Sequence, residues 1–277
     1  MKKKGKEPIG DRMKTFYEDA YQLHLPRRSY LIIRVDGRAF HTYTKPFDKP
    51  FDWRISEAMR ATASELLHEI QGAKIAYVQS DEISILVTDF DKLTTSAWFD
   101  NNLQKIVSMS ASIASSAFMR AMVEVQELID DYQCTGYTGV RFEKLPPPLF
   151  DSRVMILPSK SEVSNYFYWR YRDATRNAIL TFGQSKYSQK QLNGKGTGDV
   201  YELIKDEYEV DVEGNRYVSV GEDGDYVTLH NEVTPYNRYG EFFFSDSDTE
   251  DNADGSIRHE SAEAFHKYLE FYIPNNP

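Results

Sequence analysis

Residues 30–37 read Tyr-Leu-Ile-Ile-Arg-Val-Asp-Gly, an apolar run that ends in an acidic residue, Asp36, and a glycine. A short run rich in isoleucine, leucine and valine predicts a buried β-strand. A second stretch of this kind covers residues 76–87, Ala-Tyr-Val-Gln-Ser-Asp-Glu-Ile-Ser-Ile-Leu-Val, and carries Asp81 and Glu82 at its centre. Its two β-rich halves predict a hairpin whose tip holds both acidic residues.

The two acidic strand ends favour metal-assisted chemistry. Asp36 closes one predicted strand and Asp81 lies at the tip of the hairpin. Either residue alone is explained more simply as part of a turn. On neighbouring strands, however, two carboxylates offer the hard oxygen ligands that Mg²⁺ takes, with water and phosphate oxygens completing the shell. The pair therefore predicts phosphoryl chemistry with divalent cations, and the Gly37 carbonyl is a further candidate ligand.

The order of the predicted elements is that of an α+β fold. Apolar side chains recur on one face over residues 56–70, which predicts a helix that ends before Gly72. Residues 8–24 and 101–127 also have helical patterns, and residues 153–157 predict another strand. Together with the first strand and the hairpin, these elements give a polymerase-palm-like, ferredoxin-like βαββαβ core with helices on one face of its sheet.

The pattern changes near residue 160. Residues 166–182 are aromatic and helical, residues 207–230 alternate with a period of two, and residues 245–256 are acidic and polar. We therefore predict a catalytic domain over residues 1–160 and a C-terminal extension with helices, β-hairpins and an acidic tail over residues 161–277.

Composition narrows the class of protein. With 277 residues, of which 40% are hydrophobic, the chain is long enough to bury a sizeable core. Its one cysteine, Cys134, excludes an internal disulfide and favours a reducing compartment. No run of about eighteen apolar residues and no N-terminal signal segment are present, so we expect a cytoplasmic protein without a membrane partner. The net charge of −10 argues against a nucleic-acid partner, but much of it lies after residue 245, which weakens the objection.

Lys49 precedes a predicted helix that Asp52 caps, and a lysine there can reach phosphates gathered by metal ions. Ser80, beside Asp81, can contact the edge of a base. Residues 193–198, Asn-Gly-Lys-Gly-Thr-Gly, look like a phosphate loop but lack its first glycine and its final serine or threonine. The sequence therefore gives a P-loop little support.

Five motifs occur in an order and spacing that resemble a known family. They are Ile33–His41, Lys49–Asp52, Gln79–Glu82, Phe150–Val154 and Tyr168–Arg170. Over roughly residues 10–205 the chain is similar to the histidine-tRNA guanylyltransferases and their like-proteins. The resemblance implies a palm-like enzyme that adds nucleotides to RNA 5′ ends, after a nucleoside triphosphate has activated the 5′-phosphate.

The resemblance also implies a set of site residues and partners. The catalytic residues would be Asp36, Asp81, Glu82 and Lys49; the ligands of two Mg²⁺ ions would be Asp36, Gly37 and Asp81; and the nucleotide pocket would use Gly37, Arg38, Ala39, Phe40, His41 and Ser80. The expected RNA-contacting residues are Lys105, Asn177, Lys186, Lys190 and Lys195. The substrates would be tRNA, ATP and GTP, and the family suggests a homotetramer.

Two departures favour the like-proteins, which repair truncated tRNA 5′ ends on the opposite strand as template. Thr175 stands where the guanylyltransferases proper carry a histidine, and Asp100 and Asn101 stand where those enzymes carry a basic pair. Three alternatives remain: a guanylyltransferase proper that adds one guanosine, a nucleotide cyclase on the same palm, and an inactive RNA-binding protein.

Overall fold

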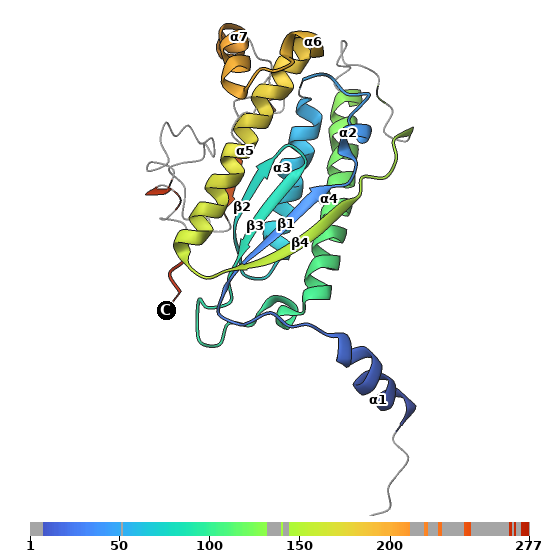
Figure 1. Cartoon of the computed structure of the whole chain (residues 1–277). Coiled ribbons are helices and arrows are strands. Elements are labelled where there is room, and N and C mark those ends of the chain that lie inside the picture. Colours follow the sequence, from blue (N-terminus) through green and yellow to red (C-terminus); the bar gives the residue numbers. More distant parts are fainter. Residues whose placement is uncertain are drawn as a thin grey trace, which may run out of the picture.

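The computed structural model describes residues 8–50, 52–131, 140, 144–210, 219–220, 227–228, 241–244, 266–267, 269 and 273–276. Its centre is an antiparallel sheet of strands β1 (Tyr30–Gly37), β2 (Ala73–Gln79), β3 (Glu82–Val87), β4 (Phe150–Leu157) and β7 (Glu241–Phe244). The strand order is β4-β1-β3-β2-β7, so β1 lies between β3 and β4 (Figure 1). The strand predicted for residues 30–37 and the hairpin predicted for residues 76–87 are confirmed. The acidic end of β1 and the acidic start of β3 are neighbours.

Helices α3 (Trp53–Glu69) and α4 (Leu103–Asp131) cover one face of the sheet. Their buried side chains pack with alternate residues of β1, such as Ile33 and Val35, in the larger of the cores. Alanines such as Ala114 on α4 are buried in this core, as expected if small residues let the helix lie close to the sheet.

The turn from α3 to β2 depends on Gly72. Its φ is +83°, and a Cβ atom would lie 2.2 Å from the carbonyl oxygen of Thr88. The Thr88 amide also donates to the Gly72 carbonyl at 2.9 Å. The glycine that ends the predicted helix is therefore required by the close approach of two backbone segments.

The prediction of helices on one face only is wrong. Helix α5 (Lys160–Lys186) covers the second face, where Tyr166 and Phe167 pack against Ile32 and Tyr77 (Figure 1). The physical reason lies in β1, whose residues Ile32 and Ile33 point to opposite faces and are both 0% exposed. A strand that is apolar on both faces needs a covering layer on each.

The segment after residue 160 also contributes to the core of the sheet. Leu269 and Ile273 are buried beside α5, and the Tyr30 hydroxyl donates to the Pro274 carbonyl at 2.8 Å. Strand β7 pairs with β2, with Phe244 opposite Ile75. The predicted boundary at residue 160 therefore does not separate two independent cores.

Among the described residues up to 228, the rest of the predicted extension consists of helices and one small strand pair. Helices α6 (Gln189–Leu192) and α7 (Thr197–Val210) follow α5, and Phe182, Val200 and Ile204 form a separate small core between α5 and α7. Strands β5 (Ser219–Val220) and β6 (Val227–Thr228) pair with each other. The predicted hairpin turns and the acidic segment at residues 245–256 lie outside the described residues.

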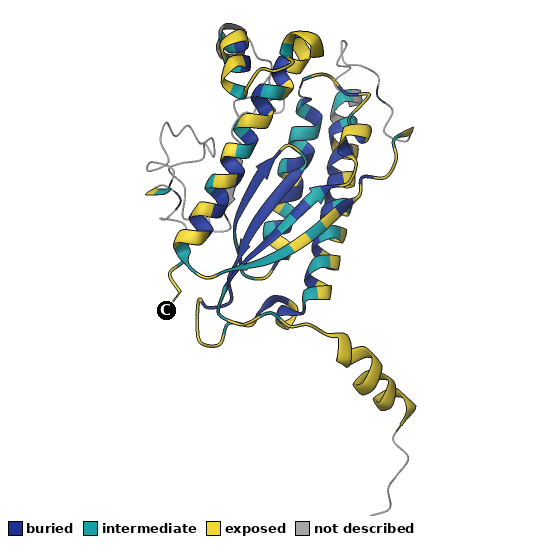
Figure 2. Cartoon of the chain, viewed as in Figure 1, coloured by how far each residue is buried: buried dark blue, intermediate teal, exposed yellow. Residues whose placement is uncertain are grey.

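The N-terminal segment departs from its predicted role. It consists of α1 (Ile9–Met13), a π-helical turn (Lys14–Glu18) and a 3₁₀ turn (Asp19–Tyr21). These turns extend away from the sheet, and all of their residues are exposed (Figure 2). The apolar side chains that recur there at helical spacing are 48% to 76% exposed, namely those of Met13, Phe16, Tyr17 and Tyr21.

Among the described residues, one helical stretch is long and apolar enough to cross a membrane by length and composition, residues Leu103–Glu127 of α4. The sequence prediction did not find it because serines interrupt the apolar run. Residues Ala114 and Phe118 of this stretch are 0% exposed and pack on the sheet, so α4 acts as a core helix.

Two neighbouring residues of α4 test this packing. Phe118 is 0% exposed and contacts the rings of Phe40 and Phe150, whereas Met119 is 51% exposed. We expect Phe118→Ala to lower the free energy of unfolding by about 3–5 kcal/mol, because it leaves a cavity in the larger core. Met119→Ala should change it by less than about 1 kcal/mol. Urea denaturation of both variants measures the difference, and equal effects would contradict the assigned face of α4.

Candidate functional site

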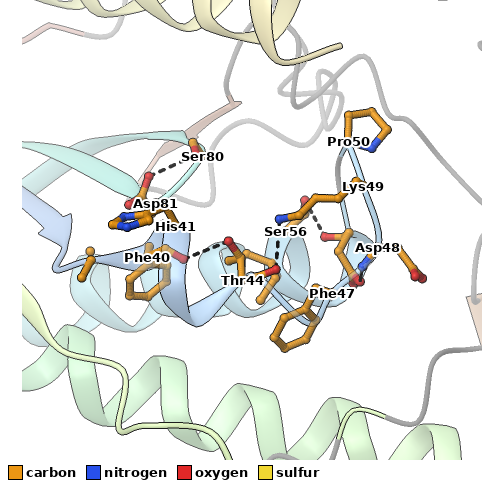
Figure 3. A pocket seen from close by; sticks show the side chains of 14 residues that line it. Phe40, His41, Thr44, Phe47, Asp48, Lys49, Pro50, Ser56, Ser80 and Asp81 are labelled. Atoms are coloured by element: carbon orange, nitrogen blue, oxygen red, sulfur yellow. Dashed lines mark hydrogen bonds between the residues drawn. The ribbon is translucent and has the colours of Figure 1, made fainter. Parts of the chain in front are cut away.

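A cavity of about 350 Å³ opens where β1 ends, beside the tip of the β2–β3 hairpin. This volume suits a small-molecule ligand. The lining residues come from the end of β1, the short helix α2 (Phe40–Tyr43), the following loop and the start of α3 (Figure 3). They are Gly37, Ala39, Phe40, His41, Thr44, Phe47, Asp48, Lys49, Pro50, Asp52, Ile55, Ser56, Ser80 and Asp81.

The backbone at the end of β1 is fixed by its neighbours. The Gly37 amide donates to the Asp81 carbonyl at 2.9 Å, and the Arg38 amide donates to the Leu149 carbonyl at 2.7 Å. Residue 37 must be small, since a Cβ there would lie 2.4 Å from the Phe40 ring. That ring packs against Tyr43 at a centroid distance of 5.2 Å, so one wall of the cavity is anchored in the larger core.

The two acidic residues predicted from the sequence lie side by side at this end of the sheet. Asp81 lines the cavity, and its carboxylate accepts a hydrogen bond from the Ser80 hydroxyl at 3.1 Å. Asp36 precedes Gly37 and lies outside the lining itself. Burial raises the pKa of Asp81, and the neighbouring Asp36 carboxylate adds to that rise. Burial also raises the pKa of Asp36, with a further contribution from Asp151.

This carboxylate pair fits a divalent cation by its chemistry. Both carboxylates are partly buried and have raised pKa values, and the Asp36 charge adds to the rise at Asp81, so a cation would supply a counter-charge that favours their ionised forms. Within the described residues, no group of three or more histidine, cysteine or acidic side chains could hold a metal ion. A cation here would therefore take ligands from Asp36, Asp81 and the Gly37 carbonyl, and complete its shell with water or phosphate oxygens.

Lys49 lies across the cavity from the acidic residues. Its ammonium group donates to the Thr44 carbonyl at 3.0 Å, and the Thr44 hydroxyl donates to the Phe40 carbonyl at 2.8 Å (Figure 3). The loop that carries Lys49 is tied to α3, because the Asp52 carboxylate accepts from the Asp48 amide at 2.9 Å. The cavity thus has a positive group facing a negative one.

Sequence reasoning found Asp52 as the helix cap but missed its partner. The Asp52 carboxylate accepts from the Arg54 amide at 3.0 Å, which confirms the predicted cap of α3. The Arg54 guanidinium donates to the same carboxylate at 2.9 and 2.6 Å, and its side chain is 2% exposed. It also lies 5.0 Å from the centroid of the Phe47 ring. Nothing in the sequence pattern distinguished this buried arginine from a surface one.

The remaining predicted pocket residues divide into two groups. Gly37, Ala39, Phe40, His41 and Ser80 line the cavity, while Arg38 is exposed and lies outside the lining. His41 extends toward Asp81 (Figure 3). Its ring forms a hydrogen bond with the Thr42 hydroxyl at 3.1 Å.

Glu82 does not reach the cavity. Its carboxylate accepts two hydrogen bonds from Arg170 of α5, both at 2.8 Å, on the opposite face of the sheet. Its side chain is only 10% exposed. The structure therefore does not support the prediction of Glu82 as a catalytic group. The reason is that Asp81 lies in the turn and lines the cavity, whereas Glu82 is the first residue of β3 and points to the face that α5 covers.

The predicted RNA-contacting residues are all exposed but do not form one cluster. Asn177 and Lys186 are on α5, Lys190 is on α6, and Lys195 precedes α7. Lys105 lies at the start of α4, which is at the other end of the molecule from α6 and α7 (Figure 1). Four of the residues thus share one end of the fold and the fifth does not.

An α+β fold in which Asp81 and a lysine face each other across a ligand-sized cavity, with Asp36 beside it, fits the class of phosphate-handling enzymes. Comparison with known proteins gives the particular family. The family model described as tRNAHis guanylyltransferase matches residues 10–158, more than half of the chain. The chain therefore belongs to the tRNAHis guanylyltransferase family, a family of nucleotidyltransferases.

Two solved structures support this assignment. A bacterial tRNA(His) guanylyltransferase (Thg1)-like protein in complex with ATP is 36% identical and has a TM-score of 0.70, covering 95% of this chain and 98% of its own. A bacterial protein of the same description in complex with GTP is 47% identical, with a TM-score of 0.56, covering 65% of this chain and 77% of its own.

A curated relative is matched over a shorter range. The probable tRNA(His) guanylyltransferase of Mus musculus is 29% identical over 196 residues, or 65% of this chain. The chain spans 59% of the length of that relative.

We expect Asp81→Asn to stabilise the cation-free protein at neutral pH. Burial raises the pKa of Asp81, so the folded protein holds this proton more tightly than the unfolded chain does. The wild type therefore loses stability as the pH rises through the range of that carboxyl, and the asparagine variant does not. In EDTA, the melting temperature of Asp81→Asn should be higher than that of the wild type at neutral pH. The two melting temperatures should become equal in acid.

Asp11→Asn provides a matched control, because Asp11 is exposed on α1. Its melting temperature should equal that of the wild type at every pH. Added Mg²⁺ should raise the melting temperature of the wild type and of Asp11→Asn but not of Asp81→Asn. A destabilised Asp81→Asn variant in EDTA would contradict an uncompensated charge at this position.

Proposed function

We propose that this protein adds nucleotides to the 5′ end of tRNA in the 3′-to-5′ direction and uses the opposite strand as template. The observation that carries the proposal is the cavity in which Asp81 and Lys49 face each other beside Asp36. Family membership supports a tRNA substrate, and the similar structures bound to ATP and GTP support nucleoside triphosphates. The antiparallel sheet with acidic residues at its strand ends agrees with a polymerase-palm-like core.

The proposed reaction assigns distinct tasks to the residues of the cavity. Lys49 binds triphosphate oxygens with a point charge, and the Asp52 and Arg54 pair holds its loop in place. Phe40 and His41 border the space for the base. Asp36, Gly37 and Asp81 would hold Mg²⁺ ions, which when bound neutralise triphosphate charge and lower the pKa of the attacking hydroxyl. We assign no side chain as a general base.

The preference for a templated end rests on two substitutions within the family pattern. The Thr175 hydroxyl donates to the Tyr171 carbonyl at 3.0 Å within α5, so its hydrogen is committed to the helix. Asn101 is 7% exposed and donates to the Pro26 carbonyl at 3.2 Å. Neither side chain supplies the cationic contact expected of a guanylyltransferase specific for histidine tRNA. Base pairing with the template then selects the nucleotide.

The deciding assay supplies labelled triphosphates and Mg²⁺ with 5′-monophosphorylated tRNAs that lack one or more 5′ nucleotides. We expect addition that restores Watson–Crick pairs on several tRNAs, and weak addition of guanosine to intact histidine tRNA. Asp36→Ala should abolish both, because it removes a cation ligand worth on the order of 4 kcal/mol or more in the transition state.

The same assay separates the alternatives. Efficient unpaired guanosine addition confined to histidine tRNA would make the protein a guanylyltransferase proper. A cyclic product formed without RNA would make it a nucleotide cyclase. RNA binding with no incorporation would make it a binding protein.

Lys49→Ala should reduce nucleotide addition without changing RNA binding. The substitution removes a point charge from the triphosphate but leaves the carboxylates in place. We expect a loss of roughly 2–4 kcal/mol in transition-state stabilisation, measured as kcat/KM for the incoming nucleotide. An equal loss of RNA affinity in a filter-binding assay would show that Lys49 contacts the RNA backbone instead. Lys45→Ala, in the same loop and outside the lining, is the control.

A further inference from the structure

A buried ion pair lies directly behind the acidic turn. The Nε and Nη2 atoms of Arg170 donate to Oε1 and Oε2 of Glu82, both at 2.8 Å. The two side chains are 8% and 10% exposed. Such a two-bond contact fixes the orientation of the carboxylate as well as its position. Arg170 thereby connects α5 to the first residue of β3.

The carboxylate of Glu82 also joins the two strands of the hairpin. The side-chain amide of Gln79 donates to Oε1 of Glu82 at 3.0 Å. The Ser84 hydroxyl donates to the same oxygen at 3.4 Å. Gln79 ends β2 and Glu82 begins β3, so these contacts close the hairpin on the side away from the cavity. Only Ser80 and Asp81 lie between them.

The turn itself is held in a demanding conformation. Ser80 has a φ of 50°, in the left-handed region, and Asp81 follows it toward the cavity. The Asp81 carbonyl accepts from the Gly37 amide at 2.9 Å. A left-handed serine persists only where its surroundings impose the conformation. The contacts of Glu82 behind the turn and of Gly37 beside it provide that restraint.

Arg34 cannot take over the role of Arg170. Its Nε atom lies 3.9 Å from the nearer Glu82 oxygen, too far for a hydrogen bond. Among the described residues, no partner accepts a hydrogen bond from this buried nitrogen. Arg170 has further contacts that fix its own position, since it lies 3.3 Å from the Asp173 carboxylate and 4.6 Å from the centroid of the Trp169 ring.

We propose that Arg170 is a positioning residue for the reaction: by holding Glu82 from behind, it fixes the Ser80–Asp81 turn so that the Asp81 carboxylate faces the cavity. This inference rests on the proposed function for its catalytic readout. It also predicts a local effect on the turn that can be measured without RNA. Arg170 itself touches neither the cavity nor a substrate placed there.

The test compares Arg170→Gln, Arg170→Lys and Arg172→Gln with the wild type. Arg172 is exposed two residues along the same helix and does not contact Glu82, so it matches the change in charge. We expect Arg170→Gln to lower kcat for nucleotide addition by at least about tenfold, with KM for the nucleotide changed less than about threefold. Arg170→Lys should recover part of kcat, because it keeps the charge but not the two-bond geometry.

Hydrogen exchange of the ligand-free protein gives the second readout. In Arg170→Gln we expect the backbone amides of residues 79–83 to exchange at least about tenfold faster, while those of α4 keep their wild-type rates. Arg172→Gln should match the wild type in both measurements.

Three results would decide against the inference or its basis. Wild-type kcat in Arg170→Gln would overturn the positioning role. Faster exchange spread evenly over the whole sheet, with activity falling in proportion to the folded fraction, would reduce Arg170 to a structural residue and overturn it equally. A wild-type protein without nucleotide addition would refute the proposed function instead, and the exchange of residues 79–83 would then decide the role of Arg170 alone.

Discussion

The backbone hydrogen bond from the Gly37 amide to the Asp81 carbonyl joins the end of β1 to the tip of the β2–β3 hairpin. It forms only in the register that pairs Asp36 with Glu82 across β1 and β3. A slip by one residue would turn Ile33 and Val35 to the opposite face and break the larger core. The packing of β1 on both faces therefore fixes the position of the acidic groups.

This register brings several negative charges close together. Asp36, Asp81 and Glu82 lie within one end of the sheet, and burial raises the pKa of the first two. The acidic side chains have different surroundings on the two sides of this end of the sheet. Arg170 neutralises Glu82 behind the sheet, while the cavity is lined by the Asp81 carboxylate and by Lys49, whose ammonium group donates to the Thr44 carbonyl. Burial without a full counter-charge is unfavourable for a carboxylate, which is why we propose a cation and phosphate groups for this cavity.

Much of the site could be predicted from local sequence, because it is built from local patterns. The strand end at Asp36, the hairpin around Asp81 and the cap at Asp52 each depend on a few consecutive residues. The position of Glu82 on the far face could not be predicted, because its partner, Arg170, is 88 residues away. The covering of the second face by α5 could not be predicted either, since an aromatic helix can be buried against any apolar surface.

The exposure of the N-terminal segment could not be predicted for a related reason. Apolar residues at helical spacing indicate a face that can be buried but do not name the surface that buries it.

Helix α5 is continuous from Lys160 to Lys186, which makes it about 40 Å long at 1.5 Å per residue. Arg170 sits on its core-facing side, and Lys186 is exposed near its far end. Each residue of an α-helix turns the chain by about 100°, so one inserted residue between these positions would rotate everything beyond it by that angle. The Lys186 side chain would then point in a different direction, and Phe182 would no longer pack in the small core with α7. Relatives that keep this architecture can therefore vary the composition of α5 between these residues, but not its length.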